Sequence, residues 1–262
     1  MITIGIDPIA FTVGLVSVRW YGIMIALAVV VLVLWMLRES RRGANLSPDT
    51  IITAALVGVP SGVVLSRLLH VVDMWEYYSQ HPGEIIGGGG LTIWGAVLGA
   101  TLGIWIYSKI SKFQFGYFAD LVAPAIILAQ AIGRVGCLIN GCCYGLPTSL
   151  PWGIVYTNPN SLAPLGVAVH PTQVYEIVYN LIVFGVLLKL RGRLKPDGSL
   201  FLIYLSLYSL WRFGIDFIRE GTPFLFGLHQ AQVIGLVVLA IAIPLLALRM
   251  KRGGAGEQSQ RY

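Results

Sequence analysis

Two arginines and an aspartate share one face of an apolar segment near the carboxyl end of the chain. With two tyrosines they recur at intervals of 4, 4, 4 and 3 residues: Tyr204, Tyr208, Arg212, Asp216 and Arg219. Residues three and four apart lie on the same side of a helix. A guanidinium group donates two parallel hydrogen bonds and keeps its charge in a low-dielectric site, so it suits a phosphate better than lysine does. The stripe therefore indicates an anion-binding helix face.

Two further apolar segments carry polar stripes of the same kind. Their members are again three or four residues apart: Gln130, Arg134 and Cys137 in one, and Gln173, Glu176 and Asn180 in the other. Three such faces can converge only on a shared interior. We expect Arg134 and Arg212 to hold one phosphodiester between them.

The alternative role for these stripes is structural. Arg212 and Asp216 can neutralise each other, and glutamine side chains can bond across helices. We assign that structural role to Glu176 and Asn180. For Arg134 it is the weaker explanation, because no acidic residue lies within one helical turn of it.

Glycine-rich backbone accompanies the stripes. Residues 133–145 read GRVGCLINGCCYG, and a second glycine run covers 87–90. Non-helical backbone at membrane depth is tolerated only where it is buried or lines a cavity, whereas small residues also let helices pack closely. We expect close packing at the first two glycines of 133–145, and a turn at the mouth of the site, beside Asn140, at the last two: Gly133, Gly136, Gly141 and Gly145.

The composition indicates which kind of chain positions these stripes. Of 262 residues, 56% are hydrophobic and only 11% are charged, against about 25% charged residues in a soluble domain. This excludes a soluble globular domain and a disordered chain. Three cysteines are too few for a disulfide framework. We predict an all-α polytopic membrane protein.

The predicted spans follow from the charge-poor runs. A helix needs about 20 apolar residues to cross the hydrocarbon. We predict about seven spans, at 20–37, 51–66, 85–108, from about 121, at about 172–188, at about 199–218 and within 221–248. They form a single transmembrane domain, 1–250, with loops on its outer face, followed by a basic cytoplasmic tail, 251–262. The apolar segment 1–18 has no signal-peptide pattern, so we place it along the membrane surface.

Positive charge predicts the orientation. Thirteen of the 18 lysines and arginines fall in the loops after the first, third and fifth spans and in the tail, which places these on the cytoplasmic side. The N-terminus is then outside and the C-terminus is cytoplasmic. Five basic residues remain, and they map to the outer half of the membrane or to its outer surface: Arg19, Arg67, Arg134, Arg212 and Arg219. All four histidines also map to the outer side. Charges at membrane depth usually face a functional cavity, so we expect a cationic outer-leaflet site that suits an anionic lipid head group.

These residues resemble a family signature. Segment 133–145 matches in outline the pattern G-R-x-G-N-F-x-N-G-E-x-x-G of the prolipoprotein diacylglyceryl transferases. Three further segments are similar to that family: Arg19-Trp20-Tyr21-Gly22, His170-Pro171-Thr172-Gln173-Val174-Tyr175-Glu176 and Arg212-x-x-x-Asp216-x-x-Arg219. The resemblance covers essentially the whole chain.

The resemblance implies a multi-pass enzyme of the bacterial cell (inner) membrane with its active site toward the outer leaflet. Such enzymes move diacylglycerol from phosphatidylglycerol to the lipobox cysteine thiol of a preprolipoprotein, which forms a thioether and releases glycerol phosphate. This is the first step of bacterial lipoprotein maturation. The implied partners are phosphatidylglycerol, the lipobox peptide and membrane lipids, without nucleic acid. No metal or cofactor is implied.

Carried over position by position, the resemblance gives Arg134 and Arg212 as the two essential arginines. It assigns the other motif positions to substrate binding: Tyr21, Trp94, Asn140, Gly141, Gly145, Gln173, Tyr175, Asp216 and Arg219. The chain departs from the family at four of its positions. Cys137 replaces an asparagine, Cys142 and Asp216 replace glutamates, and Trp94 stands where many members carry a histidine.

The base role of that family histidine therefore cannot be transferred to this chain. His170 is our candidate for a general base, because it lies on the predicted outer side near 133–145. It is also well placed as a turn residue, since His-Pro opens a helix naturally. An acceptor thiol reacts as its thiolate, and arginines that stabilise both the thiolate and the leaving phosphate would make a dedicated base unnecessary.

The cysteines leave other functions open. A membrane thiol–disulfide oxidoreductase would use Cys137, Cys142 and Cys143 with a quinone, but the chain has no C-x-x-C and adjacent cysteines pair badly. A metal site is weaker still, because it has only three sulfurs and no nearby histidine. A lipid transporter would often show inverted repeats, and we see none. Small cysteines packed against glycines are the simplest interpretation.

Overall fold

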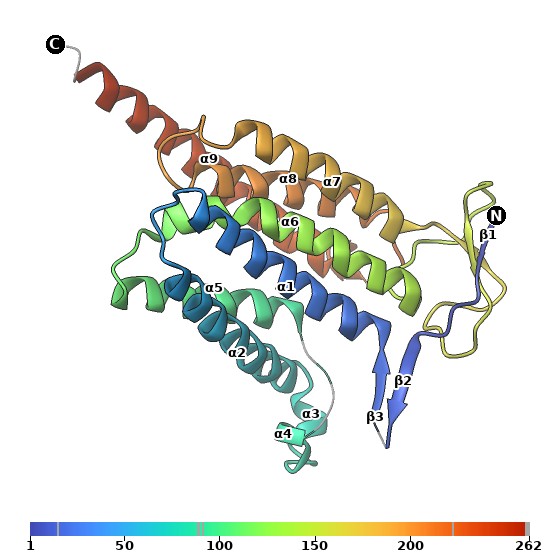
Figure 1. The fold of residues 1–262 in the computed structure, drawn as a ribbon. Coiled ribbons are helices and arrows are strands. Elements are labelled where there is room, and N and C mark those ends of the chain that lie inside the picture. Colours follow the sequence, from blue (N-terminus) through green and yellow to red (C-terminus); the bar gives the residue numbers. More distant parts are fainter. Residues whose placement is uncertain (15, 88–89, 91, 222, 260–262) are drawn as a thin grey trace. The chain divides into compact units, whose positions relative to one another are not determined.

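The computed structural model describes residues 1–14, 16–87, 90, 92–221 and 223–259, and it is mainly helical (Figure 1). The longer helices are α1 (Trp20–Arg41), α2 (Pro48–Asp73), α5 (Ile93–Ile110), α6 (Phe115–Asn140), α7 (Thr172–Leu190), α8 (Ser199–Ile215) and α9 (Gln230–Ser259). Within the described residues, six of these, all but α8, are long and apolar enough to cross a membrane. The predicted all-α polytopic membrane protein is confirmed.

Helix α8 is the seventh apolar helix, and it is shorter than predicted. Its 17 residues end at Ile215, so it is about 26 Å long, against a hydrocarbon thickness of about 30 Å. Asp216 is its C-cap residue. The predicted stripe therefore leaves the helix before its last member, and Arg219 lies in the following loop, bridged to Gly145.

The third predicted span begins later than expected. Residues 85–87 belong to the short helix α4 (Glu84–Gly87), which follows α3 (Trp75–Tyr78), and α5 starts only at Ile93. Of the glycine run 87–90, residues 88 and 89 lie outside the described residues. So do residues 260–262 of the predicted tail.

Short strands occur outside the helices. They are β1 (Ile2–Ile4), β2 (Ile9–Val13), β3 (Val16–Arg19), β4 (Ile154–Tyr156), β5 (Ala168–Val169), β6 (Pro223–Leu225) and β7 (Leu228–His229). Three of these strands lie in segment 1–19: β2 pairs antiparallel with β3, and β1 pairs in parallel with β4. The amino terminus consequently lies beside the loop between α6 and α7 (Figure 1).

The chain divides into two compact units. The first comprises 1–35 and 116–262, and the second comprises 36–115. In the first unit α6, α7 and α8 run side by side (Figure 1) and share a buried apolar core: Ala123, Ile127, Val183, Leu187, Leu200 and Tyr204. The Asp120 carboxylate of α6 accepts hydrogen bonds from Gly198 N at 2.7 Å and Phe201 N at 2.8 Å. This caps the start of α8 and fixes it against α6.

In the second unit, small residues bring α2 and α5 together. A Cβ atom on Gly95, Gly99 or Gly103 of α5 would collide with Ser66 or Ser61 of α2. These glycines recur every four residues, so they form one face of α5. In the first unit, a Cβ on Gly136 would lie 3.1 Å from Tyr21 Cα. Close packing at Gly136, as the sequence predicts, therefore joins α6 to α1.

Candidate functional site

The loop that follows α6 is held by the first turn of α7. Thr172 Oγ1 donates a hydrogen bond to the Cys143 carbonyl at 2.6 Å, and Gln173 Nε2 donates to the Cys142 carbonyl at 2.7 Å. Gly141 has a φ of 70°, and a Cβ there would collide with Ser161. The predicted turn at Gly141 is confirmed, because only a residue without a side chain fits both constraints.

The same loop also contacts the segment after α8. Gly145 N donates to the His170 carbonyl at 2.9 Å, and Leu146 N donates to the Ile218 carbonyl at 2.9 Å. A Cβ on Gly145 would lie 2.5 Å from that Ile218 oxygen and 2.6 Å from His170 Cβ. The loop thus joins the carboxyl end of α6, the amino end of α7 and the carboxyl end of α8.

Arg134 on α6 is ion-paired with Glu176 on α7, Nε to Oε1 at 2.8 Å. The expectation that Arg134 lacks an acidic partner was wrong, because the acid comes from another helix. Glu176 keeps the structural role that the sequence assigned to it. Arg134 Nη1 also lies 3.8 Å from Cys137 Sγ. The side chains of Arg134 and Glu176 are 17% and 4% exposed, so the charges are shielded from water.

Arg212 and Asp216 form the pair that their spacing predicts. Arg212 Nη2 lies 3.0 Å from Asp216 Oδ1 and donates to Oδ2 at 3.1 Å. Arg219 Nη1 lies 3.9 Å from the same Oδ1. Nη1 of Arg212 is buried and has no hydrogen-bond partner among the described residues. This arginine therefore has a donor available for a ligand.

Other buried polar atoms line the same helices. Among the described residues, no hydrogen-bond partner is present for the side-chain oxygens of Gln130 and Gln173, or for either amide atom of Asn180. Asn180 was assigned a role in bonding between helices, and its contacts here do not supply that bond. Buried polar atoms normally find partners in protein or water. The interior between α6 and α7 is thus suited to polar groups.

The three cysteines converge at the end of α6. Their Sγ atoms all lie within 4.8 Å of one another: Cys137, Cys142 and Cys143. All three are free, and Cys137 is buried while the other two are half-buried. Hydrogen bonds from Cys137 and Cys142 lower the pKa of the Cys143 thiol, and the charges of Arg219 and Arg134 lower it further.

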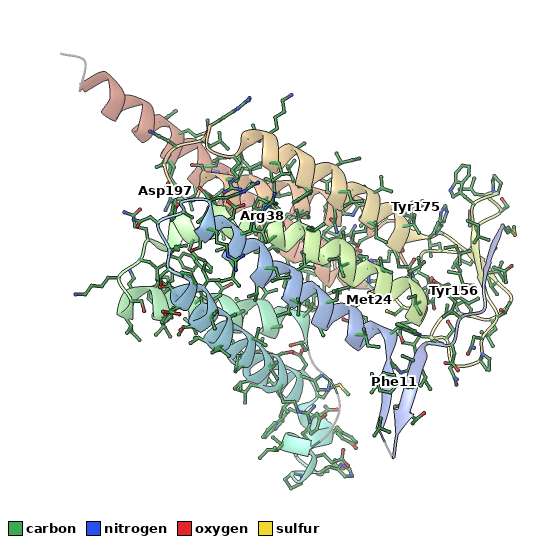
Figure 2. All side chains as sticks on the ribbon, viewed as in Figure 1. Phe11, Met24, Arg38, Tyr156, Tyr175 and Asp197 are labelled. Atoms are coloured by element: carbon green, nitrogen blue, oxygen red, sulfur yellow. The ribbon has the colours of Figure 1, made fainter. Side chains whose placement is uncertain are left out.

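His170 lies just before α7 and faces Tyr175. Its Nδ1 is 3.4 Å from the Tyr175 hydroxyl, which accepts a hydrogen bond from Trp152 Nε1 at 2.9 Å. Tyr175 and Tyr156 lie at one end of the first-unit helices, and Asp197 lies at the opposite end (Figure 2). The His170 backbone also makes the turn that the alternative interpretation expects, with the hydrogen bond from Thr172 N to the His170 carbonyl at 2.9 Å.

The remaining predicted positions are divided between the two units. Arg19 Nη1 donates to Asn140 Oδ1 at 3.0 Å, so Asn140 contacts the start of α1. Tyr21 is 40% exposed on α1. Trp94, at the start of α5, belongs to the second unit. Its part in a site remains a prediction.

Sequence reasoning missed two contributors to this end of the first unit. Thr172 holds the Cys143 carbonyl, and Trp152 holds the Tyr175 hydroxyl. Thr172 lies inside the His170–Glu176 segment, where a threonine at a helix start is a signal for local hydrogen bonding. Trp152 lies in the loop between α6 and α7, and nothing in its spacing indicates this contact.

The fold is that of a polytopic helical membrane protein, and in its first unit Arg134, Arg212 and Arg219 lie on or beside α6 and α8 together with buried polar side chains. Comparison with known proteins gives the family. The family model described as prolipoprotein diacylglyceryl transferase matches residues 8–248. The chain belongs to this family.

Similar proteins agree over nearly the full length. A phosphatidylglycerol–prolipoprotein diacylglyceryl transferase of Dehalococcoides mccartyi is 52% identical over 252 residues, which covers 96% of this chain and 97% of the relative. Proteins of the same name from Symbiobacterium thermophilum and Clostridioides difficile are 40% and 38% identical. They cover 94% and 88% of this chain, and 94% and 90% of their own lengths.

Proposed function

We propose that this chain transfers the diacylglyceryl group of phosphatidylglycerol to the lipobox cysteine thiol of preprolipoproteins. The names of its relatives contain both substrates. The observation that carries the proposal is Arg212, whose buried Nη1 has no partner among the described residues while Nη2 holds Asp216. An unpaired buried donor is costly, and a phosphate oxygen supplies the missing acceptor.

The charge of the site supports an anionic lipid. Among the groups that are shielded from water at this end of the first unit, four arginines face two carboxylates, those of Glu176 and Asp216, whereas Asp7 and Glu220 are exposed. The arginines are Arg19, Arg134, Arg212 and Arg219. Phosphatidylglycerol carries one negative charge on its phosphodiester. An excess of guanidinium groups therefore attracts this head group and stabilises the additional charge on the leaving phosphate.

The reaction is a displacement at carbon. The acceptor thiolate attacks the glycerol carbon that bears the phosphate, a C–S bond forms, and the C–O bond breaks. Glycerol phosphate leaves with the electron pair. Arg212 binds the phosphate, and Arg134, oriented by Glu176, donates to it through Nη2. His170 is the candidate base for the thiol proton, and its contact with Tyr175 sets the ring direction.

The other family positions divide into loop-shaping and substrate-facing residues. Asn140, Gly141, Gly145 and Gln173 shape the loop through the contacts described above. Tyr21 and Tyr175 are exposed enough to meet lipid or peptide. We assign the same role to Trp94.

The direct test is transfer by the purified chain. Detergent-solubilised protein is mixed with phosphatidylglycerol and a synthetic lipobox peptide, and thioether-linked diacylglyceryl peptide and glycerol phosphate are measured by mass spectrometry. Arg212→Ala should lose transfer, while Arg193→Ala, which removes an exposed arginine in the turn after α7, is the matched control. Absence of product from the unaltered, folded protein overturns the proposal.

We also propose that the chain lies in the bacterial inner membrane with this site toward the outer leaflet. The loop from 141 to 169 contains no lysine or arginine, which is typical of an outer loop. A reporter fused after Arg42 or Arg193 should report the cytoplasm, and one inserted near Ser161 should report the outside. A cytoplasmic signal at Ser161 contradicts this orientation.

A further inference from the structure

Three thiols meet at the end of α6 with the spacing of a metal site. The Sγ atoms of Cys137, Cys142 and Cys143 lie within 4.8 Å of one another. In a tetrahedral zinc site with Zn–S distances of about 2.3 Å, two sulfurs are about 3.8 Å apart. Rotamer adjustments of about 1 Å bring the three sulfurs to that geometry.

The backbone is shaped so that two adjacent cysteines face one point. Side chains of neighbouring residues normally diverge, but Gly141 has a φ of 70° and Cys143 a φ of 63°. A residue other than glycine in this left-handed region is uncommon and is a sign of constraint. The side chains of Thr172 and Gln173 hold the carbonyls of Cys143 and Cys142 in place.

The surroundings fit a bound cation with an open side. Cys137 is buried, while Cys142 and Cys143 are half-buried, so one side of the cluster is accessible. Zinc bound by three thiolates has a net charge of minus one. Arg134, whose Nη1 lies 3.8 Å from Cys137 Sγ, donates a hydrogen bond to the sulfur while its Nε is paired with Glu176.

We propose that Cys137, Cys142 and Cys143 bind Zn²⁺ and that its fourth ligand is the acceptor thiol of the lipobox peptide. Catalytic zinc sites use three protein ligands and leave the fourth position to substrate. In the sequence, the lack of a nearby histidine argued against a metal site. A histidine ligand is unnecessary if the acceptor thiol supplies the fourth ligand. This inference rests on the proposed function, because it gives the transferase a means of activating its second substrate.

The step balances without an oxidant or reductant. The acceptor thiol binds Zn²⁺ as a thiolate, because a coordinating thiol is deprotonated, and its proton passes to His170, the candidate base of the proposed function. Its sulfur then attacks the glycerol carbon bonded to phosphate. The C–S bond forms, the C–O bond breaks, and glycerol phosphate takes the electron pair. The thioether product is a neutral, weaker ligand and leaves the metal.

The first measurement is metal content. The full chain, purified in detergent without chelators, should contain about one zinc per chain by mass spectrometry of the metal. Cys142→Ser and Cys143→Ser should each reduce this at least tenfold without lowering the melting temperature of the metal-free protein. His81→Ala, which removes an exposed histidine of the second unit, is the matched control and should keep the zinc.

The second measurement asks whether the acceptor thiol reaches the metal. Replacement of Zn²⁺ by Co²⁺ should give the visible bands of a tetrahedral site and a thiolate-to-cobalt charge-transfer band. Lipobox peptide should increase that band, and a peptide with serine in place of the cysteine should not. Both measurements work whether or not lipid is transferred.

The outcomes separate the two proposals. Zinc-free protein that transfers lipid at full rate in the presence of a chelator overturns the zinc inference and leaves the proposed function standing. Zinc and a peptide-dependent cobalt spectrum without any transfer support the metal site and overturn the proposed function. Zinc retained by Cys142→Ser, a preference for Cu⁺ alone, or a disulfide between two of the cysteines in the active protein each overturns the zinc inference.

Discussion

Arg67 in the second unit and Arg134 in the first unit are both arginines that the sequence places in the outer half of the membrane or at its outer surface, and they are held in different ways. Arg67 donates through three nitrogens to main-chain carbonyls of the segment that follows α3: Glu84 at 2.5 Å, Ile85 at 2.8 Å and Gly90 at 3.0 Å. Its guanidinium also lies 5.0 Å from the centre of the Tyr78 ring. Arg67 thus fastens a segment of backbone.

Arg134 meets side chains instead. Its Nε holds the Glu176 carboxylate from another helix, and its Nη1 faces the sulfur of Cys137. A sulfur is a weak acceptor, and a carboxylate can share an arginine with an anionic ligand. The contrast teaches that depth in the membrane does not by itself identify a functional arginine. The partners of the arginine identify its role. Backbone carbonyls as partners indicate a structural role, and titratable side chains on facing helices indicate a functional site.

The largest effect is expected from Arg134. Arg134→Ala should abolish transfer while the protein still accumulates, a loss of about 10²–10³-fold or more for a removed transition-state donor. Arg134→Lys should also be poor, because a point charge cannot replace the paired donors. The measurement is the transfer assay on quantified, folded protein.

Arg134→Ala also leaves the buried Glu176 carboxylate without its partner, which costs about 3–5 kcal/mol. The double variant Arg134→Gln/Glu176→Gln avoids this, since two amides can bond to each other without charge. It should fold and remain inactive. Normal turnover by the double variant would remove Arg134 from the phosphate site.

Arg67 should show the opposite pattern. Arg67→Ala should lower the stability of the second unit by about 1–2 kcal/mol, because several carbonyls lose a charged donor. Limited proteolysis should then cut within 84–90, and Arg67→Lys should restore part of the protection. Unchanged protease resistance in Arg67→Ala would contradict the fastening role.

The smallest predicted effect concerns the hydrogen bond between Tyr77 and Glu84, next to the backbone that Arg67 holds. Tyr77 donates to the Glu84 carboxylate at 2.8 Å, and this hydrogen bond raises the pKa of the Tyr77 phenol. A raised pKa adds stability that is fully present below the ordinary phenol pKa and is lost as the pH rises through the folded value. The melting temperature difference between the unaltered protein and Tyr77→Phe should therefore shrink as the pH rises above about 10. A melting temperature difference that grows as the pH rises above about 10 would contradict the raised pKa of Tyr77.

The sequence predicts elements well where the signal lies within one helix. Arg19 ends the charged residues before the first span, and α1 begins at Trp20 as expected. The Arg212–Asp216 pair also follows from spacing alone. The end of α8 at Ile215 does not, because the polar periodicity continues beyond it and the loop is fixed by contacts with Gly145 and Leu146.

Residue spacing along the sequence does not predict contacts between different helices. Glu176 is far from Arg134 in the chain, so no helical turn relates them, and the pair depends on how α6 packs against α7. The convergence of the cysteines depends on the backbone conformations of Gly141 and Cys143. A pattern of residue types does not specify these conformations, and packing was therefore the simplest interpretation of the thiols.

The parallel pairing of β1 with β4 has a consequence for biosynthesis. Ile2–Ile4 cannot find their partners until residues 154–156 have left the ribosome. At about 5–20 residues per second, this takes about 10–30 s. During that interval α1, α2, α5 and α6 can insert while the first strand waits unpaired. The strand pairing at this end of the first unit therefore forms only late in translation. Until then the nascent chain has no complete site for lipids to bind.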